Sequence, residues 1–315
     1  MKVVALAGGV GAGKFLRGVL RLVKPEDVTA VVNTGDDMTL HGLRICPDLD
    51  SVTYWLAGLA DRKRGWGRDD ESFRALRELR RIGGQAWFSL GDLDLGTHLA
   101  RTQWLAEGAA LSEATARLAA AVGVGARIIP MSDDDVATWI DSVDQEGTAR
   151  TDPFQTYWVA RGGADEVKGV RFEGADRAGP GPGVLEAIAE ADAVLFCPSN
   201  PVVSVAPILA VPGIREAVAA RREHAAGVSP IIGGAPVAGM ADRLMPAVGL
   251  EVSALGAASA YRGLLSGWVI DSRDAGLGPR IEAELGMRAV ATDTLMTDDE
   301  AAERVAGAAL ELAAG

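Results

Sequence analysis

The sequence predicts an α/β protein with a Rossmann-like, mostly parallel sheet flanked by helices, and three observations indicate this. The chain begins with an apolar run that stops in a glycine cluster, residues 3–14, after which apolar residues recur at helical spacing. A second apolar run, residues 28–33, follows after one helix length, as in a β–α–β unit. Strand candidates alternate with helical patterns again after residue 179, which is typical of a doubly wound sheet.

The turn after the first predicted strand has the composition of a phosphate-binding loop. Glycine lets an anionic ligand approach the main chain, and the backbone N–H groups at the start of the next helix point toward that ligand. A glycine-rich turn without a ligand is the alternative. Phe15 stands where a P-loop NTPase needs a serine or threonine for its magnesium, and the spacing of a dinucleotide-binding loop is also missing. The residues expected to bind phosphate are Gly8, Gly9, Val10, Gly11 and Lys14.

Composition narrows the classes of function. The 315 residues include 39 glycines and are 48% apolar, enough for a large core in one domain that can carry an insertion. A formal net charge of −12 argues against binding to nucleic acid or to a membrane surface, since both require a positive field. The two cysteines are too few for a disulfide framework, and we expect buried thiols. With no leader-like segment and no apolar run of membrane length, we expect a cytoplasmic protein.

Acidic residues follow the second predicted strand. Because this strand should lie parallel to the first, Asp36 and Asp37 are expected at the same sheet edge as the glycine loop. The next acidic pair, Asp48 and Asp50, leads into a predicted helix. Asp48 could cap that helix, which leaves the second carboxylate for chemistry or for water.

A third acidic loop begins at Asp92, after residues 87–90, for which the composition predicts a short strand. In the helix that starts here, Asp94 and His98 would share a face at i and i+4 spacing. A lone histidine is more often structural than functional. Further helices are expected over residues 73–83 and 111–122, and a further strand over residues 126–130.

The pattern changes between residues 132 and 179, where shorter alternating pieces and scattered aromatic residues replace the strand–helix alternation. We interpret residues 132–179 as a small inserted subdomain or lid with β character, and residues 1–131 with 180–315 as one Rossmann-like core. The later strand candidates are residues 193–197, 228–232, 268–271 and 289–292.

Two loops that follow these strands, residues 198–201 and 229–234, lie where open α/β sheets hold ligands. Turn chemistry alone is the alternative explanation of their composition. Asp271, at the end of another strand candidate, resembles the magnesium-binding aspartate of an NTPase, although Phe15 still argues against that class.

Together these loops resemble one family, the 2-phospho-L-lactate and phosphoenolpyruvate transferases of coenzyme F420 biosynthesis. One such loop would be weak evidence, but eight in order over nearly the whole chain are specific. A related group of nucleotide-sugar-binding regulators shares the fold and the glycine-rich start but is less similar at residues 47–50 and 64–67. The matching motifs are Gly8-Gly9-Val10-Gly11 with Lys14, Asn33-Thr34-Gly35-Asp36-Asp37, Cys46-Pro47-Asp48-Leu49-Asp50, Arg64-Gly65-Trp66-Gly67, Leu90-Gly91-Asp92 through Thr97-His98, Pro130-Met131-Ser132-Asp133-Asp134, Pro198-Ser199-Asn200-Pro201 and Ser229-Pro230-Ile231-Ile232-Gly233.

The resemblance implies a transfer reaction. A guanosine diphospho-linked lactate or enolpyruvate would give its acid, with the phosphate, to the ribityl hydroxyl of a 7,8-didemethyl-8-hydroxy-5-deazariboflavin, and GMP would be released with Mg²⁺ required. Such a reaction needs neutralisation of the diphosphate oxygens and alignment of the incoming hydroxyl. The family is usually homodimeric. The residues leave open whether the donor acid is lactate, enolpyruvate or glycerate, because these differ by a few atoms.

The resemblance also implies roles for individual residues. The metal or phosphate-side pair would be Asp36 and Asp37, and Asp48 or Asp50 would orient or deprotonate the acceptor hydroxyl. Guanosine would lie against Asn200 and the loop from Ser229 to Gly233. The deazaflavin would lie near Asp48, Asp50, Asp92, Thr97 and His98.

One position departs from the family pattern. Family members often carry Gly-Asp-Arg-Asp where this chain has Leu93 after Asp92, and Arg68 or Arg101 could replace the missing arginine. A noncatalytic nucleotide-sugar-binding regulator of the same fold is the alternative function. A regulator that only binds a nucleotide has no need of a carboxylate pair such as Asp48 and Asp50, so this pair favours the enzyme.

Overall fold

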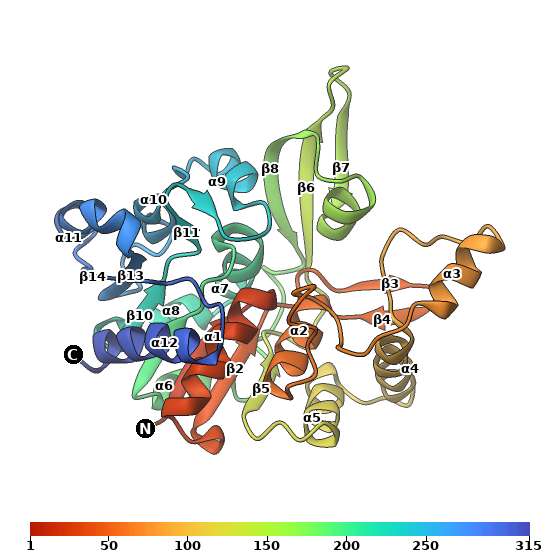
Figure 1. The fold of residues 1–315 in the computed structure, drawn as a ribbon, viewed down its shortest axis with the longest axis horizontal. Coiled ribbons are helices and arrows are strands. Elements are labelled where there is room, and N and C mark those ends of the chain that lie inside the picture. The colour runs from red at the N-terminus through yellow and green to blue at the C-terminus, as the bar shows by residue number, and fades with distance from the viewer.

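Seven parallel strands form the central sheet of the computed structural model, which describes residues 1–315 (Figure 1). They are β1 (Val3–Ala7), β2 (Val28–Val32), β5 (Arg127–Pro130), β9 (Ala193–Phe196), β10 (Ala225–Val228), β13 (Gly267–Asp271) and β14 (Arg288–Thr292). Their order across the sheet is β14-β13-β10-β9-β1-β2-β5. The predicted α/β, Rossmann-like class is confirmed.

The strand order reverses next to β1. This strand pairs with β2 on one side, Val3 opposite Val28, and with β9 on the other, Val3 opposite Ala193. The predicted parallel pairing of the first two strands is therefore confirmed. In open α/β sheets, ligands bind in the crevice at the carboxyl ends of the two strands where the order reverses. The segments that follow β1 and β9 flank this crevice.

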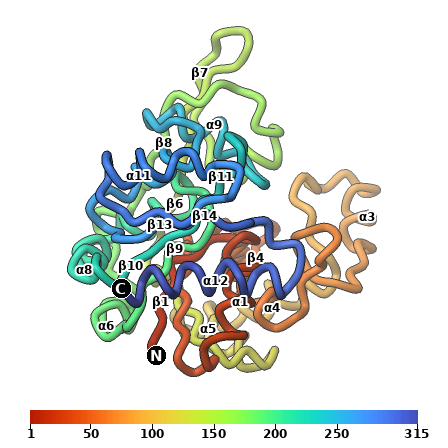
Figure 2. Tube along the Cα trace, turned by 60° about the vertical axis from the view of Figure 1, so that its left-hand side comes forward, coloured from red at the N-terminus to blue at the C-terminus, as the bar shows by residue number.

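Helices cover both faces of the sheet, and alternate side chains of β1 divide between two cores. Val3 and Ala5 belong to the core that includes residues of α1 (Gly9–Leu22) and α12 (Asp299–Ala314), whereas Leu6 points to the opposite face. The first and last helices of the chain lie side by side, as Figures 1 and 2 show. Both ends of the chain are thereby tied to one face of the sheet.

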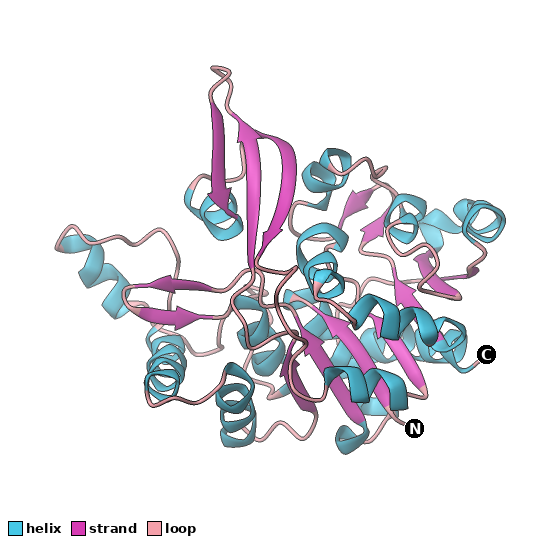
Figure 3. Cartoon of the chain, turned by 180° about the vertical axis from the view of Figure 1, so that it is seen from behind, coloured by secondary structure: helices cyan, strands magenta, loops and turns pink.

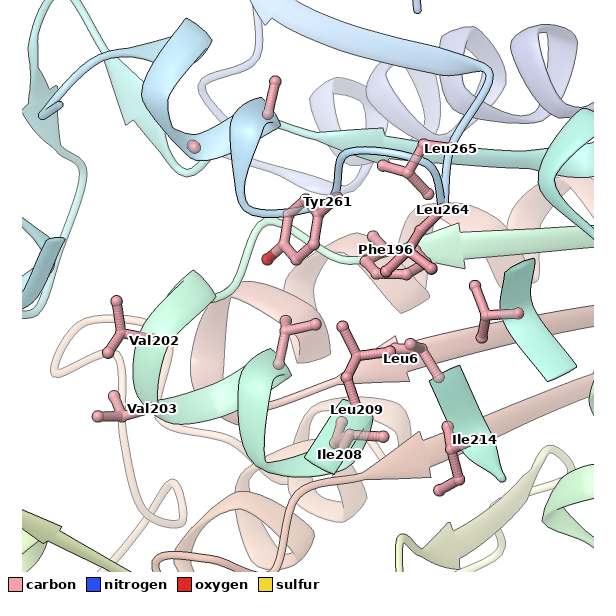
Figure 4. Close-up of a cluster of buried hydrophobic side chains, with 14 of the residues drawn as sticks. Leu6, Phe196, Val202, Val203, Ile208, Leu209, Ile214, Tyr261, Leu264 and Leu265 are labelled. Atoms are coloured by element: carbon pink, nitrogen blue, oxygen red, sulfur yellow. The ribbon is translucent and has the colours of Figure 1, made fainter. Parts of the chain in front are cut away.

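The core on the other face joins the sheet to residues from the second half of the chain. In Figure 4, Leu6 and Phe196 of the sheet lie between Leu209 on one side and Tyr261 on the other. The rings of Phe196 and Tyr261 meet edge to face, with centroids 4.8 Å apart. This packing fixes β9, whose end forms part of the crevice.

A three-stranded antiparallel sheet leaves the core between β5 and α6 (Val184–Glu190), and it projects upward in Figure 1. Its strands are β6 (Ala137–Val143), β7 (Ala149–Pro153) and β8 (Glu166–Glu173), in the order β7-β6-β8. It occupies the segment for which the sequence predicts an inserted subdomain, residues 132–179. Ile140 and Tyr157 belong to the same buried core as Leu6, so the core continues from the main sheet into this small one, and β8 packs beside α9 (Ala241–Ala247).

The longest excursion runs from β2 to β5 and is only partly evident from the sequence. It contains β3 (Met38–Leu40), β4 (Leu43–Ile45), α2 (Pro47–Leu56), α3 (Arg74–Arg81), α4 (Asp92–Ala106) and α5 (Leu111–Ala121). The hairpin of β3 and β4 extends away from the main sheet, as Figure 3 shows from behind. The strand predicted at residues 87–90 is wrong: these residues form a loop, and Trp87 and Phe88 pack against Ile45 and Leu90. Their apolar character reflects burial without a partner strand.

Two further details differ from the sequence prediction. The strand expected at residues 228–232 ends where that range begins, so the loop after β10 starts at Ser229. Cys46, rather than Asp48, occupies the N-cap of α2, and both Asp48 and Asp50 lie in the first turn. Cys46 and Cys197 are buried free thiols, as predicted.

The remaining helices, strands and turns are mostly short. They are α7 (Ala206–Ala210), α8 (Ile214–Ala220), α9 (Ala241–Ala247), α10 (Ala254–Ser259), α11 (Gly278–Leu285), the hairpin of β11 (Ile231–Ile232) and β12 (Ala235–Pro236), three short 3₁₀ turns (Pro25–Asp27, Arg222–His224 and Ser272–Leu277) and two π-helical turns (Thr156–Ala160 and Pro201–Val205). None of the helices is by itself long and apolar enough to cross a membrane. One bent pair, Pro201–Ala210 with Ile214–Ala220, meets the criteria of length and composition alone.

Candidate active site

A cleft of about 610 Å³ opens at the carboxyl ends of β1 and β9. The glycine-rich start of α1 and the first turns of α2 form its floor together with residues 198–200. The segment that follows β7 contributes Phe154, Gln155 and Trp158 on one side, and residues 294–296 contribute on another. Segments from the whole length of the chain thus meet where the fold class predicts a ligand.

Gly8 is the only residue between β1 and α1, so the strand runs almost directly into the helix. A Cβ atom at Gly8 would lie 2.5 Å from the Cβ of Ser204 and 2.8 Å from Oδ2 of Asp48. One at Gly11 would lie 2.5 Å from the carbonyl oxygen of Pro198. Glycine is therefore required by close packing at both positions. The same packing presents the N-terminus of α1 to the cleft, where an anion is favoured.

The loop after β9 is fastened to the glycine turn. Ser199 Oγ donates a hydrogen bond to the Gly8 carbonyl oxygen at 2.8 Å and accepts one from the Gly8 N–H at 3.3 Å. Asn200 Oδ1 accepts from the N–H of Val202 at 2.9 Å and thereby caps the following π-helical turn. Lys14 lines the cleft, with Nζ 5.5 Å from the centre of the Trp55 ring. It is the basic side chain nearest to the glycine turn in sequence.

Two carboxylates, Asp36 and Asp48, face the cleft beside the glycine turn. Burial, together with the charges of Asp48 and Asp37, raises the pKa of Asp36 well above its usual value, and Oδ1 of Asp36 has no hydrogen-bond partner. Burial also raises the pKa of Asp48 to about 6, although the Asn33 amide donates to its Oδ2 at 2.9 Å. Two neighbouring buried carboxylates that repel each other and keep an oxygen without a hydrogen-bond partner suit a hard divalent cation such as Mg²⁺.

Asp37 lies outside the cleft lining, although the sequence analysis pairs it with Asp36 as a metal ligand. Its carboxylate points toward Arg44, with Oδ2 3.4 Å from the guanidinium. Burial raises the pKa of Asp37 to about 7, and the charge of Arg44 opposes that shift. The residues that could hold Mg²⁺ in the cleft are therefore Asp36 and Asp48.

Asp50 lies in the same turn of α2 as Asp48 but faces α4. The guanidinium of Arg101 donates to both of its carboxylate oxygens, one of them at 3.1 Å. His98 lies between this pair and Asp94: its Nδ1 is 3.6 Å from Asp50 Oδ2, and its Nε2 is 3.3 Å from Asp94 Oδ2. The predicted shared face of Asp94 and His98 is confirmed by this contact.

The Tyr54 hydroxyl donates to Asp94 Oδ1 at 2.6 Å. Burial pushes the pKa of the Asp94 carboxyl upward, but its contacts with His98 and with the Tyr54 hydroxyl outweigh this and hold the pKa below its usual value. Asp50, Asp94 and His98 offer three ligand atoms within 4.8 Å of one another. A cation there would lie beside the Arg101 guanidinium, which already neutralises Asp50, so this arrangement is a poorer cation site than Asp36 with Asp48.

Comparison with known proteins decides the family. The family model described as 2-phospho-L-lactate transferase CofD matches residues 3–306. The chain belongs to this family. It is 50% identical to a phosphoenolpyruvate transferase of Kitasatospora aureofaciens, over 99% of this chain and 98% of that protein, and 43% identical to one of Mycolicibacterium smegmatis, over 99% of each. A 2-phospho-L-lactate transferase of Methanosarcina mazei is 39% identical over 96% of this chain and 97% of its own length.

Solved structures support the fold of this CofD-family chain. A protein of the UPF0052 family from Bacillus halodurans superposes with a TM-score of 0.62 and covers 98% of this chain and 99% of its own, at 20% identity. At that identity the likeness concerns the fold alone. The resemblance inferred from the loop motifs, to a transferase family, is confirmed by the family match.

The cleft of this CofD-family protein brings together most of the residues singled out from the sequence. Of the residues named above as binding phosphate, metal, guanosine or deazaflavin, four lie outside its lining: Asp37, Asp92, Thr97 and Gly233. Asp92 accepts hydrogen bonds from the N–H groups at the start of α3, and the Gly233 N–H donates to Asp274. Those in the lining are Gly8, Gly9, Val10, Gly11, Lys14, Asp36, Asp48, Asp50, His98, Asn200 and Ser229.

Asp271 is engaged by the main chain. It accepts hydrogen bonds from the N–H of Thr294 at 3.0 Å, the hydroxyl of Thr294 at 3.1 Å and the N–H of Arg273 at 3.0 Å. These bonds hold Thr294 in the cleft wall and leave the carboxylate no role as a magnesium ligand. The resemblance of Asp271 to the magnesium-binding aspartate of an NTPase is therefore not supported in this CofD-family chain.

Several cleft residues escaped the sequence analysis. Trp66 and Phe88 line one part of the cleft, and Trp158 lines another. Trp66 is 43% exposed, and its ring stacks on the Arg64 guanidinium, whose carbon lies 5.0 Å from the ring centre. The available signal was a large aromatic residue between two glycines in a loop, because such loops lie on the surface and contribute little to a core.

Proposed function

We propose that the protein transfers a phosphoenolpyruvyl or phospholactyl group from a guanosine diphospho-linked donor to the ribityl hydroxyl of 7,8-didemethyl-8-hydroxy-5-deazariboflavin, releasing GMP, in coenzyme F420 biosynthesis. One observation carries the proposal: the N-terminus of α1 and the carboxylates of Asp36, Asp48 and Asp50 line a single cleft. A diphosphate needs positive groups such as the N-terminus of α1. An incoming hydroxyl needs a proton acceptor such as a carboxylate.

The phosphate groups of the donor would lie against Gly9, Gly11 and Lys14, where backbone N–H groups and one ammonium oppose their charge. Mg²⁺ held by Asp36 and Asp48 would supply further neutralisation of the diphosphate. The guanosine would extend toward Asn200 and Ser229, at the ends of β9 and β10. This arrangement follows the general position of nucleotides in doubly wound sheets.

The deazaflavin would enter beside α2 and α4. Trp66, Phe88 and Tyr54 line this part of the cleft and offer apolar faces to a flat ring. Asp50 and Asp94 lie there too and can accept hydrogen bonds from the hydroxyl groups of a ribityl chain. The aromatic and acidic side chains thus match the two parts of the acceptor.

In the transfer, the acceptor oxygen forms a bond to the phosphorus that carries the small acid, and the bond from that phosphorus to the oxygen of GMP breaks. The hydroxyl proton passes to Asp50. Because phosphoryl transfer has a loose transition state, this proton becomes acidic only as the new bond forms, so an oriented carboxylate is adequate as its acceptor. Positioning and charge neutralisation then provide most of the rate.

The donor acid is proposed to be enolpyruvate. The relatives at 50% and 43% identity are named phosphoenolpyruvate transferases, whereas the 2-phospho-L-lactate transferase is 39% identical. Since the acids differ by a few atoms, discrimination between them should be modest in size.

The test is to incubate the purified protein with the deazaflavin, Mg²⁺ and each guanosine donor in turn, and to identify the products by mass spectrometry. The expected result is the phosphodiester of the deazaflavin together with GMP, fastest with the enolpyruvyl donor. Binding of GDP without transfer from any donor would instead support a nucleotide-sugar-binding regulator. Release of phosphate from ATP or GTP alone would point to an NTPase. Sedimentation of the same sample tests the expected homodimer.

A further inference from the structure

Arg101 is buried next to the cleft without lining it. It is 1% exposed, and its guanidinium donates to both oxygens of Asp50 and, more weakly, to the carbonyl oxygen of Arg44 at 3.4 Å. Asp50, by contrast, does line the cleft, as do His98 and Asp94. A buried cation thus stands directly behind a row of polar groups that a ligand would touch.

The guanidinium also contacts its neighbour His98. It can only donate, and its Nη1 lies 3.5 Å from His98 Nδ1, so Nδ1 is the acceptor in this contact. His98 Nε2 lies 3.3 Å from Asp94 Oδ2 without forming a hydrogen bond, and the other Asp94 oxygen accepts from the Tyr54 hydroxyl. The guanidinium therefore fixes the Asp50 carboxylate directly and packs against the imidazole.

The geometry points to Arg101 as a positioning residue for the transfer: through its two-pronged contact it holds the Asp50 carboxylate toward the acceptor hydroxyl. This inference rests on the proposed function. A planar guanidinium suits the role because it fixes the rotation of the carboxylate as well as its charge.

Stability alone does not account for the pair. Replacing a buried ion pair with apolar groups often leaves a protein as stable as before, because removing both charges from water is costly. The role of the Asp50–Arg101 pair would then lie in what the Asp50 carboxylate does in the cleft. A second arginine pair offers a comparison: Arg17 Nη2 lies 2.6 Å from Asp299 Oδ2, partly buried and outside the cleft.

The experiment compares Arg101→Met, Asp50→Asn, the double variant and Arg17→Met, with transfer, deazaflavin binding, donor binding and thermal unfolding measured for each. Arg101→Met should lower kcat/KM for the deazaflavin about 10²-fold, as expected of a misplaced reacting group, while KM for the donor stays within about twofold. Because Arg101 acts through Asp50, the double variant should be no slower than Asp50→Asn. Arg17→Met should retain transfer.

Stability separates positioning from a merely structural role. The double variant removes both buried charges and should recover part of the melting temperature lost in Arg101→Met, yet transfer should stay low. If transfer recovered together with the melting temperature, or if Arg101→Met transferred as well as Arg17→Met, the inference would be overturned. In Arg101→Ala, added guanidinium ion should restore part of the transfer activity. If it restored none, the positioning role of Arg101 would be contradicted.

Transfer and deazaflavin binding by the wild-type protein distinguish failure of the proposed function from failure of the Arg101 inference. A wild type that binds deazaflavin but transfers nothing from any donor overturns the reaction, while weaker deazaflavin binding in Arg101→Met than in Arg17→Met would still support the positioning role. A wild type that neither binds deazaflavin nor transfers overturns both.

Discussion

Asp48 and Asp50 lie two residues apart in the first turn of α2, and both are buried, yet their surroundings differ. Asp48 faces the glycine turn with Asp36, its hydrogen-bond donor is the neutral amide of Asn33, and burial raises its pKa to about 6. Asp50 faces α4 and is paired with Arg101. Positions i and i+2 point to different sides of a helix, so one short helix serves both environments.

The two surroundings differ in whether the protein itself supplies a positive charge to the carboxylate. On the α4 side, a guanidinium, an imidazole and a phenol hold the carboxylates in fixed positions. On the glycine side, the Asp36 carboxylate keeps one oxygen without a partner. Buried carboxylates are costly unless paired, so the glycine side suits the proposed Mg²⁺, and the α4 side, where Asp50 is already paired, suits the proposed hydroxylated acceptor.

Asp48→Asn tests the glycine side and should have the largest effect. It removes one of the two charges proposed to hold Mg²⁺, and transfer should fall about 10³-fold, since the cation supplies several kcal/mol of charge neutralisation. The free energy of unfolding at neutral pH, measured in urea without Mg²⁺, should not fall, because an uncompensated buried charge is lost. A large loss of stability would show that Asp48 is compensated after all.

Asp50→Asn tests the α4 side. Transfer should fall about 10²-fold, as for loss of a catalytic acid or base, while GDP binding remains nearly intact. Unlike Asp48→Asn, this variant should lose about 3 kcal/mol of unfolding free energy, because Arg101 is left buried without its counter-charge. The same Asp→Asn substitution should therefore leave the free energy of unfolding unreduced at position 48 and lower it at position 50, and this difference is the most direct test of the two environments. Unchanged turnover would remove Asp50 from the reaction.

The pH dependence of stability should separate the two sides as well. The folded pKa of Asp48, about 6, lies above the value near 4 of an unfolded aspartate, so the folded state binds more protons between these limits. Stability is therefore lost as pH rises through this window, by on the order of 2 kcal/mol. Urea unfolding of wild type and Asp48→Asn in Mg²⁺-free buffer from pH 4 to pH 7 measures the difference between their curves. Parallel curves would contradict the assignment.

Local patterns in the sequence predicted one side of this comparison better than the other. The strand–glycine–helix order placed the glycine turn at the start of α1, and i, i+4 spacing placed Asp94 beside His98. The Asp50–Arg101 pair joins residues 51 positions apart, across the long excursion between β2 and β5, and no local pattern reports such a contact. Nor could spacing tell that Asp36 faces the cleft while Asp37 turns toward Arg44.

Asp92→Asn should have the smallest effect, although the family resemblance assigns this residue to the deazaflavin site. Its carboxylate accepts hydrogen bonds from the Ser72 hydroxyl and from the N–H groups of Arg74 and Ala75, and so caps α3 outside the cleft. Transfer should stay within about twofold of wild type, and the melting temperature should fall by about 2 °C.

The matched control is Asp94→Asn, the same substitution two residues further along α4. Asp94 lines the cleft and holds His98 and the Tyr54 hydroxyl, so this variant should weaken deazaflavin binding about tenfold, the size expected for losing one hydrogen bond to a charged group. Titration of deazaflavin fluorescence measures both variants. Because both aspartates sit in the first turn of one helix, equal losses would mean that the distinction between cleft and cap is wrong and that α3 moves with the acceptor site.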